Sequence, residues 1–202
     1  MANSSLRDIA TATGVSESTV SRVLNGLGNK YRIGKVTQQK VLTQASAFGY
    51  QPNLVARSLR LNKSNTIGLV IPDISNQFFA KIAHSIEEEA RARGYFILLS
   101  VSQEDAHQER EAIHQLLARQ IDGLIVSPVG QEQSNLLEVP DNAMPMVLID
   151  RYFKGQSQPF VISDNFQGGF MGADYLIRQG HRKIACIQGL THTSPTQDRL
   201  AG

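Results

Sequence analysis

The sequence predicts a small all-helical domain followed by an α/β domain built on a doubly wound parallel sheet. Two patterns support this. Helical periodicity dominates residues 5–48, whereas short apolar runs alternate with amphipathic helices after Lys63. Charge changes at the same place, because residues 1–63 hold nine Lys or Arg and two acidic residues, a net charge of +7, and the remainder is −5. This asymmetry favours a polyanionic partner that binds residues 1–63 and not the acidic remainder of the chain.

Composition excludes several classes of protein. No run of about 18 apolar residues is present, so we expect no membrane anchor. Residues 1–8 are polar and lack the apolar core of a secretory signal, which predicts a cytoplasmic protein. Cys186 is the single cysteine, and we therefore expect no disulfide framework.

Two short helices are predicted at the N-terminus. Ser5 and Asp8 resemble a capping box with Asp in place of Glu, and the helix that they begin is expected to run to about Thr13. Gly14 supplies the left-handed turn, and a second helix is expected over 17–24. This second helix turns apolar side chains inward, namely Val20, Val23 and Leu24, and polar ones outward, namely Glu17, Ser18, Ser21, Arg22 and Asn25.

This pair of helices is typical of a helix-turn-helix that enters the major groove of DNA. We expect Glu17, Ser18 and Arg22 to meet base edges, with Arg22 able to make a bidentate contact with guanine. Phosphate contacts are predicted for the neighbouring polar and basic side chains, namely Thr19, Ser21, Asn25, Lys30, Tyr31 and Arg32, although Thr19 and Ser21 equally suit helix caps. The alternative is an ordinary helical hairpin whose polar face is merely solvated.

A third helix and a linker complete the predicted headpiece. The helix is expected from about Val36 to Phe48, with a core-facing side formed by Val41, Leu42, Ala45 and Phe48. The linker at 54–61 is long enough for two helical turns, which are marginal alone in water. Its side chains Ala56, Arg57, Leu59 and Arg60 suit a minor groove, where Leu wedges into a base step; the alternative is a flexible basic tether.

The body is predicted to contain five apolar strands. They are expected at 66–72, 95–101, 122–128, 145–150 and 160–163, with amphipathic helices between the early ones. Ligands of such sheets bind beyond the carboxyl ends of the strands. The side chains there that suit a sugar or a phosphate are Asp73, Phe78, Phe79, Ser127, Asp150 and Arg151. For each of them the alternative is ordinary turn chemistry.

A helix and a strand at 183–189 begin a second α/β unit after Asn165. One strand and one helix cannot bury a core of their own, so we expect the sequence to be part of a longer protein, with this second subdomain truncated.

The sequence disfavours two other functions. An enzyme on the same scaffold is disfavoured because the chain offers no nucleophile elbow, P-loop or HExxH motif, and Gly26-Leu27-Gly28 lacks the third glycine of a dinucleotide fingerprint. The histidines share no metal-ligand spacing with one another or with Cys186, so we expect no metal and no cofactor. A sugar-binding module alone is disfavoured by the basic headpiece.

The sequence resembles the lactose-repressor/galactose-repressor family of bacterial transcriptional regulators, closest to its fructose and sucrose branch. The blocks that carry the resemblance are IATATGVSESTVSRVLNG, FGYQPNLVARSLR, TIGLVIPDISNQFF, QIDGLIVSP, LIDR, GHRKIACIQG and SPTQDRLAG. The resemblance implies a regulator of carbohydrate-utilisation genes, most often a repressor. It implies a homodimer or tetramer on partly palindromic operator DNA.

The resemblance also implies how the parts divide and work together. It implies a headpiece at 1–52, a hinge helix at 53–64, and a periplasmic-binding-protein-like domain whose subdomains are 65–164 and the incomplete 165–202. A sugar or sugar phosphate is expected between the subdomains, where it contacts Asp150 and Arg199. Its binding is expected to shift the subdomains and to order or disorder the hinge helices.

Overall fold

The computed structural model describes residues 5–50, 63–129, 136 and 144–202. The chain forms two compact units, Met1–Arg57 and Ser58–Gly202. The sequence-based division at 52, 64 and 164 is finer than this and stays a prediction.

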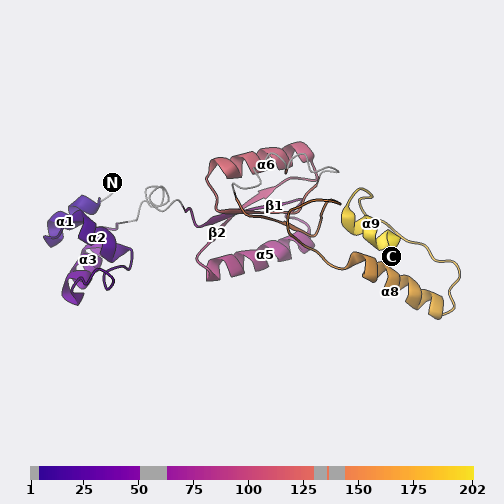
Figure 1. The fold of residues 1–202 in the computed structure, drawn as a ribbon, viewed down its shortest axis with the longest axis horizontal. Coiled ribbons are helices and arrows are strands. Elements are labelled where there is room, and N and C mark those ends of the chain that lie inside the picture. Colours follow the sequence, from indigo (N-terminus) through magenta and orange to yellow (C-terminus); the bar gives the residue numbers. More distant parts are fainter. Residues whose placement is uncertain (1–4, 51–62, 130–135, 137–143) are drawn as a thin grey trace. The chain divides into compact units, whose positions relative to one another are not determined.

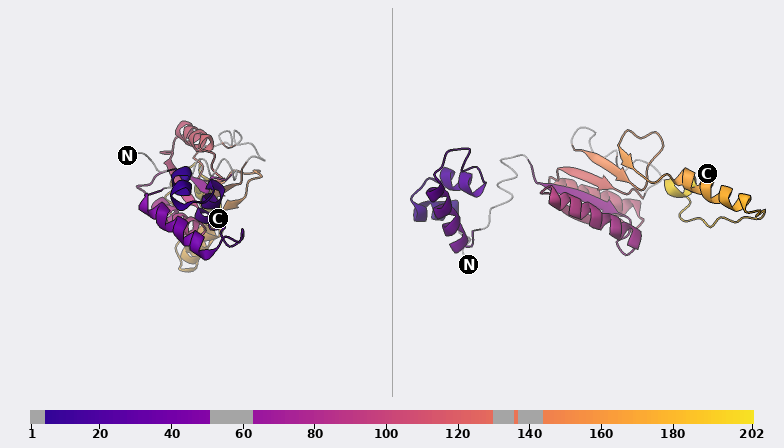
Figure 2. Two further views of the ribbon diagram at one scale, coloured as in Figure 1. Left: turned by 90° about the vertical axis from the view of Figure 1, so that its left-hand side faces the viewer. Right: turned by 90° about the horizontal axis from the view of Figure 1, so that it is seen from below.

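Three helices form the first unit: α1 (Leu6–Thr13), α2 (Glu17–Leu24) and α3 (Lys35–Ala47). The predicted capping box is confirmed, because the Ser5 side chain accepts from the Asp8 N–H and the Asp8 carboxylate accepts from the Ser5 N–H. Gly14 has a φ of 69°, the left-handed value that the turn requires. Figure 2 shows the three helices packed on one another.

The headpiece core is small and lies between all three helices. Its buried side chains are Ile9, Ala10, Val20, Val23, Val41 and Ala45. Two predicted core residues of α3 are not buried: Leu42 is 46% exposed and Phe48 is 38% exposed. Among the described residues, α3 packs against α1, α2 and the loop before it, so its buried stripe is limited to the side of Val41 and Ala45.

The second unit contains a five-stranded parallel sheet, as the sequence predicts. The strand order, which the sequence did not predict, is β2-β1-β3-β4-β5. The strands are β1 (Thr66–Ile71), β2 (Phe96–Val101), β3 (Gly123–Val126), β4 (Met146–Ile149) and β5 (Phe160–Val161). Helices α5 (Gln77–Ala92) and α6 (Ala106–Ala118) lie on opposite faces of this sheet (Figure 1).

Alternate residues of β1 supply a core on each face of the sheet. Val70 packs in the cluster under α6 with Ile113 and Leu124. Leu69 and Ile71 pack in the cluster under α5 with Phe79. Because both faces of β1 are covered, this inner strand is buried from Gly68 to Ile71, and its carboxyl end is fixed.

The last segment is less structured than predicted. Helices α8 (Asn165–Arg178) and α9 (Ser194–Ala201) pack side by side. The strand predicted at 183–189 is wrong, because these residues form no strand and Ile187 is 99% exposed. A strand needs a neighbour to hydrogen-bond with, and no described residue pairs with this segment.

Candidate nucleic-acid interface and candidate ligand site

The exposed face of α2 carries the side chains that we predicted to read bases. Glu17, Ser18 and Arg22 are exposed, whereas Val20 and Val23 of the same helix are buried. The helix begins at the Ser16 side chain, which accepts the Thr19 N–H. The geometry therefore presents a short polar helix face directly after a tight turn, which is the arrangement that a major groove accepts.

The residues predicted to contact phosphates fall into two groups. Lys30 and Arg32 are exposed in the loop between α2 and α3. Thr19 and Asn25 instead make contacts within α2: the Thr19 hydroxyl lies 2.9 Å from the hydroxyl of the N-cap serine, and the Asn25 amide donates to the Ser21 carbonyl at 2.6 Å. Both contacts lie at the ends of α2. A capping role had been left open for Thr19 but not for Asn25, and the phosphate contacts stay predictions.

Tyr31 lies against the predicted recognition arginine. The Arg22 guanidinium carbon is 4.1 Å from the centroid of the Tyr31 ring, within the range of a cation–π contact. No sequence signal indicated this pair. The predicted hinge residues Ala56, Arg57, Leu59 and Arg60 lie outside the described residues.

In the second unit, Asp150 stands at the carboxyl end of β4 in an unusual backbone conformation. Its φ is 62°, which is uncommon for a residue other than glycine, and its N–H donates to the Val161 carbonyl. Burial raises the pKa of the Asp150 carboxyl, and the charges of Arg151 and Arg199 act in the opposite direction. Arg199 is therefore near enough to affect the pKa of the Asp150 carboxyl, and contacts of these two side chains with an effector stay predictions.

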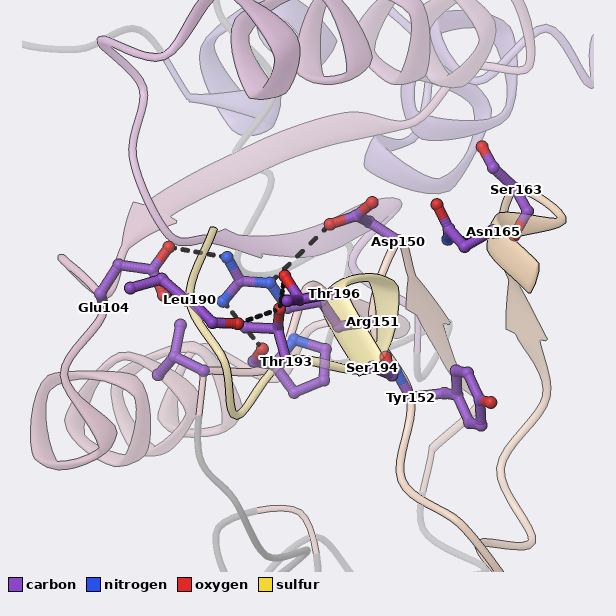
Figure 3. Close-up of polar contacts among 12 residues, drawn as sticks. Glu104, Asp150, Arg151, Tyr152, Ser163, Asn165, Leu190, Thr193, Ser194 and Thr196 are labelled. Atoms are coloured by element: carbon purple, nitrogen blue, oxygen red, sulfur yellow. Dashed lines mark hydrogen bonds and ion pairs between the residues drawn. The ribbon is translucent and has the colours of Figure 1, made fainter. Parts of the chain in front are cut away.

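Arg151 is buried and already engaged by protein groups (Figure 3). Its Nη1 and Nη2 donate to the two carboxylate oxygens of Glu104, each at 2.7 Å, and its Nε lies 3.8 Å from the Asp150 carboxylate. This bidentate pair joins the segment after β2 to the end of β4. The arrangement favours a role in holding Asp150, and an effector contact by Arg151 stays a prediction.

The other predicted ligand residues differ in burial and in hydrogen bonding. The Asp73 carboxylate accepts from the N–H and hydroxyl of Ser75, and these bonds lower the pKa of Asp73. Phe78 is half exposed, and Phe79 is buried with its ring 5.1 Å from that of Phe78. Ser127 is fully buried, and its hydroxyl has no hydrogen-bond partner among the described residues.

An open, mostly apolar cavity of about 510 Å³ lies on the α5 side of the sheet. Its lining residues are Phe78, Ile82, Ile86, Ile125, Val147, Ile149, Asp150, Val161, Ile162 and Ser163. Of the predicted ligand residues, it brings together Phe78 and Asp150 and leaves out Asp73, Phe79, Ser127, Arg151 and Arg199.

Tyr152 connects this region to α9 and was missed by the sequence analysis. Its N–H donates to the Ser194 hydroxyl at 3.0 Å, and its hydroxyl donates to the Asp198 carboxylate at 3.1 Å. Burial and this carboxylate raise the pKa of Tyr152. Its ring also stacks on Phe160 at 5.1 Å. Pairs separated by more than forty residues have no local sequence signal.

Within the described part of the chain, no cluster of three metal-ligating side chains occurs. None of the helices described there is long and apolar enough to cross a membrane.

Comparisons with known proteins match both units. Residues 5–53 match the family described as bacterial regulatory proteins, lacI family, and residues 64–202 match the periplasmic binding proteins and sugar binding domain of the LacI family. The chain belongs to the LacI family. These matches are to transcriptional regulators and not to enzymes.

LacI-family relatives are similar along nearly the whole chain. The sucrose operon repressor of Klebsiella pneumoniae is 36% identical, and the match covers 98% of this chain and 59% of the relative. The ribose operon repressor of Halalkalibacterium halodurans (strain ATCC BAA-125 / DSM 18197 / FERM 7344 / JCM 9153 / C-125) is 37% identical, with coverage of 98% and 57%. The chain thus spans less than two thirds of the length of these relatives.

Solved structures of LacI-family members are similar as well. The lac repressor dimer bound to operator and the anti-inducer ONPF has a TM-score of 0.87 and 27% identity, covering 100% of this chain and 60% of the repressor. The Cra regulator of Pseudomonas putida in complex with fructose 1-phosphate has a TM-score of 0.63 and 32% identity, covering 68% of this chain and 51% of that regulator.

Proposed function

We propose that this LacI-family protein is a sequence-specific DNA-binding transcriptional regulator that represses carbohydrate-utilisation genes in the cytoplasm. The observation that carries the proposal is the exposed polar face of α2, where Glu17, Ser18 and Arg22 follow a tight glycine turn in a basic headpiece. Similarity to the operator-bound lac repressor over the whole chain supports it. Major-groove contacts by these three side chains position the headpiece on specific bases.

The basic headpiece and the linker after it supply the affinity that does not depend on sequence. Nine Lys or Arg lie within residues 1–63, and each one that meets a phosphate releases a counterion. For about six to ten phosphate contacts, affinity falls roughly 10³- to 10⁵-fold between 50 and 200 mM salt. The minor-groove role of Leu59, flanked by Arg57 and Arg60, belongs to the same proposal.

We also infer that a sugar or sugar phosphate controls the regulator by binding beyond the carboxyl ends of the strands, in a homodimer or tetramer. The support is the position of Asp150, whose largely buried carboxylate suits a pair of sugar hydroxyls, with Arg199 near enough to affect its pKa. The similar Cra regulator was solved with fructose 1-phosphate, which favours this ligand class.

The DNA-binding proposal is tested by selecting bound sequences from random duplexes and footprinting the protein on the selected sequence. We expect a partly palindromic site protected on both halves, with strongly salt-dependent affinity. The Arg22→Ala variant should bind with relaxed base preference, because it lacks the bidentate guanine contact. Its matched control is Lys81→Ala, at an exposed position of α5, and this variant should select the same site as the wild type. Selection of the same site by Arg22→Ala would show that α2 does not read bases.

The effector proposal is tested by a thermal-shift screen of the full-length protein against free and phosphorylated fructose and sucrose. A ligand at about 100 times its Kd stabilises the folded state by about 2.7 kcal/mol. Asp150→Asn should weaken the response to the ligand that is found. An unchanged response would place the sugar elsewhere.

A further inference from the structure

The loop between α2 and α3 holds an aromatic ring against the predicted recognition arginine. The Arg22 guanidinium carbon lies 4.1 Å from the centroid of the Tyr31 ring, and the Tyr31 side chain is 46% exposed. Arg22 itself is exposed. A planar guanidinium at this distance from an aromatic ring is attracted to its face, so the stack restrains a side chain that would otherwise sample many rotamers.

The loop is closed by its own backbone hydrogen bonds. The Leu27 N–H donates to the Arg22 carbonyl at 2.8 Å, and the Tyr31 N–H donates to the Leu27 carbonyl at 3.1 Å. The Ile33 N–H donates to the Gly28 carbonyl at 2.9 Å. Tyr31 therefore sits in a turn that starts directly from the last turn of α2, where Arg22 lies.

Gln38 fastens the same loop to α3. Its amide nitrogen donates to the Ile33 carbonyl at 2.8 Å and to the Asn29 side-chain oxygen at 3.0 Å. The Gln38 side chain packs on Gly28 so closely that a Cβ at position 28 would clash with its Cδ. Ile33 also packs against the headpiece core. The loop that carries Tyr31 is thus tied to the folded headpiece on both sides.

We propose that Tyr31 is a positioning residue for base recognition: its ring holds the Arg22 guanidinium for contact with a guanine. From the sequence, Tyr31 was expected to contact a phosphate instead. The inference rests on the proposed DNA-binding function. An arginine that is restrained before binding loses less conformational freedom when it meets the base, so the stack raises affinity for the correct base more than for other sequences.

Two substitutions separate this role from a phosphate contact. Tyr31→Phe keeps the ring and removes the hydroxyl, whereas Tyr31→Leu removes both. Because the stack saves part of the cost of ordering one flexible side chain on binding, we expect it to change binding by about two- to fivefold. We expect Tyr31→Phe to bind the selected site like the wild type. We expect Tyr31→Leu to bind that site about two- to fivefold more weakly, with unchanged affinity for unrelated DNA.

The measurement is equilibrium binding of the full chain to its selected duplex and to copies in which single guanines are replaced by 7-deazaguanine. Replacement of the guanine that Arg22 contacts should weaken DNA binding by the wild type and by Tyr31→Phe but leave binding by Arg22→Ala unchanged. The same replacement should weaken binding by Tyr31→Leu to a smaller extent. Adding Tyr31→Leu to Arg22→Ala should cause no further loss. Lys30→Gln is the matched loop control, and it should weaken binding to all sequences alike and lower the salt slope by about one.

The stack is also measured without DNA. Ring currents of Tyr31 should shift the NMR signals of the Arg22 side chain upfield in the wild type and in Tyr31→Phe, and the shift should vanish in Tyr31→Leu. Tyr31→Phe should unfold at the wild-type temperature, and Tyr31→Leu should unfold only slightly lower, because the stack is exposed and Tyr31 lies outside the buried core cluster.

Three results would overturn the inference. The first is a loss of binding to all sequences in both Tyr31→Phe and Tyr31→Leu, which would indicate a phosphate contact by the hydroxyl. The second is an Arg22 signal that Tyr31→Leu does not change. The third is a wild-type chain that selects no sequence although the ring-current shift is present. This last result would refute the proposed function and with it the role of Tyr31, while leaving the stack itself established.

Discussion

Removing the carboxylate of Glu104 should destabilise the second unit measurably. Both Glu104 oxygens accept from Arg151 at 2.7 Å, and the side chains are 34% and 10% exposed, respectively. Loss of one partner of a fully buried ion pair costs about 3–5 kcal/mol. Water reaches Glu104 and the Asp150 carboxylate remains near Arg151, so we expect about 2 kcal/mol for Glu104→Gln.

Calorimetry of the full chain measures this effect on the transition of the second unit. For a unit of this size, about 2 kcal/mol lowers Tm by roughly 4–8 °C. The control is Glu87→Gln, whose partner Arg91 lies 3.5 Å away with both side chains exposed to water, and it should change stability by less than about 0.5 kcal/mol. If Glu104→Gln melted at the same temperature as Glu87→Gln, the Glu104–Arg151 pair would not stabilise the strand ends.

Three further predictions concern other parts of the chain. Burial raises the pKa of Asp150 above its ordinary 3.8, so its ionisation destabilises the folded state at neutral pH, and this penalty disappears as pH falls below 3.8. Asp150→Asn should therefore raise Tm at pH 7 and reduce the dependence of Tm on pH. Calorimetry at several pH values measures this, and a lower Tm at pH 7 would contradict the prediction. Ile9→Ala truncates a fully buried core side chain and should lower the free energy of unfolding of the headpiece by about 2–4 kcal/mol, measured as loss of helical circular dichroism at a lower temperature. A decrease of less than about 1 kcal/mol would show that Ile9 is not packed in the core. Leu59→Gly should weaken operator binding without changing the selected bases. Unchanged affinity would indicate that the linker is only a flexible basic tether.

The sequence predicted those elements whose determinants are local. The Ser5–Asp8 capping box, the Gly14 turn and the helix at 17–24 each depend on residues a few positions apart, and all three are confirmed. The parallel sheet was also predictable, because buried parallel strands are apolar throughout. The core-facing side of α3 was predicted too broadly, since periodicity shows which side of a helix is apolar and not how much a partner covers.

Contacts between distant residues were not predictable in this way. Glu104 lies 47 positions from Arg151, and Tyr152 lies 46 positions from Asp198, so no spacing rule joins either pair. The predicted strand at 183–189 failed for a related reason, because a strand depends on a partner that its own sequence does not specify. The same limit applies to the Arg22–Tyr31 stack, which the turn of the loop creates.

The central claim, that the exposed face of α2 reads bases, is tested most directly by cleavage from a tethered iron chelate. The chain has a single cysteine, so Cys186→Ser with Ser18→Cys leaves one attachment point on α2. Thr43→Cys in the same background is the control, because Thr43 is exposed on α3 between the buried Val41 and Ala45. We predict cleavage from position 18 within the major groove of each half-site and none there from position 43. Equal or absent cleavage from the two positions would contradict the claim.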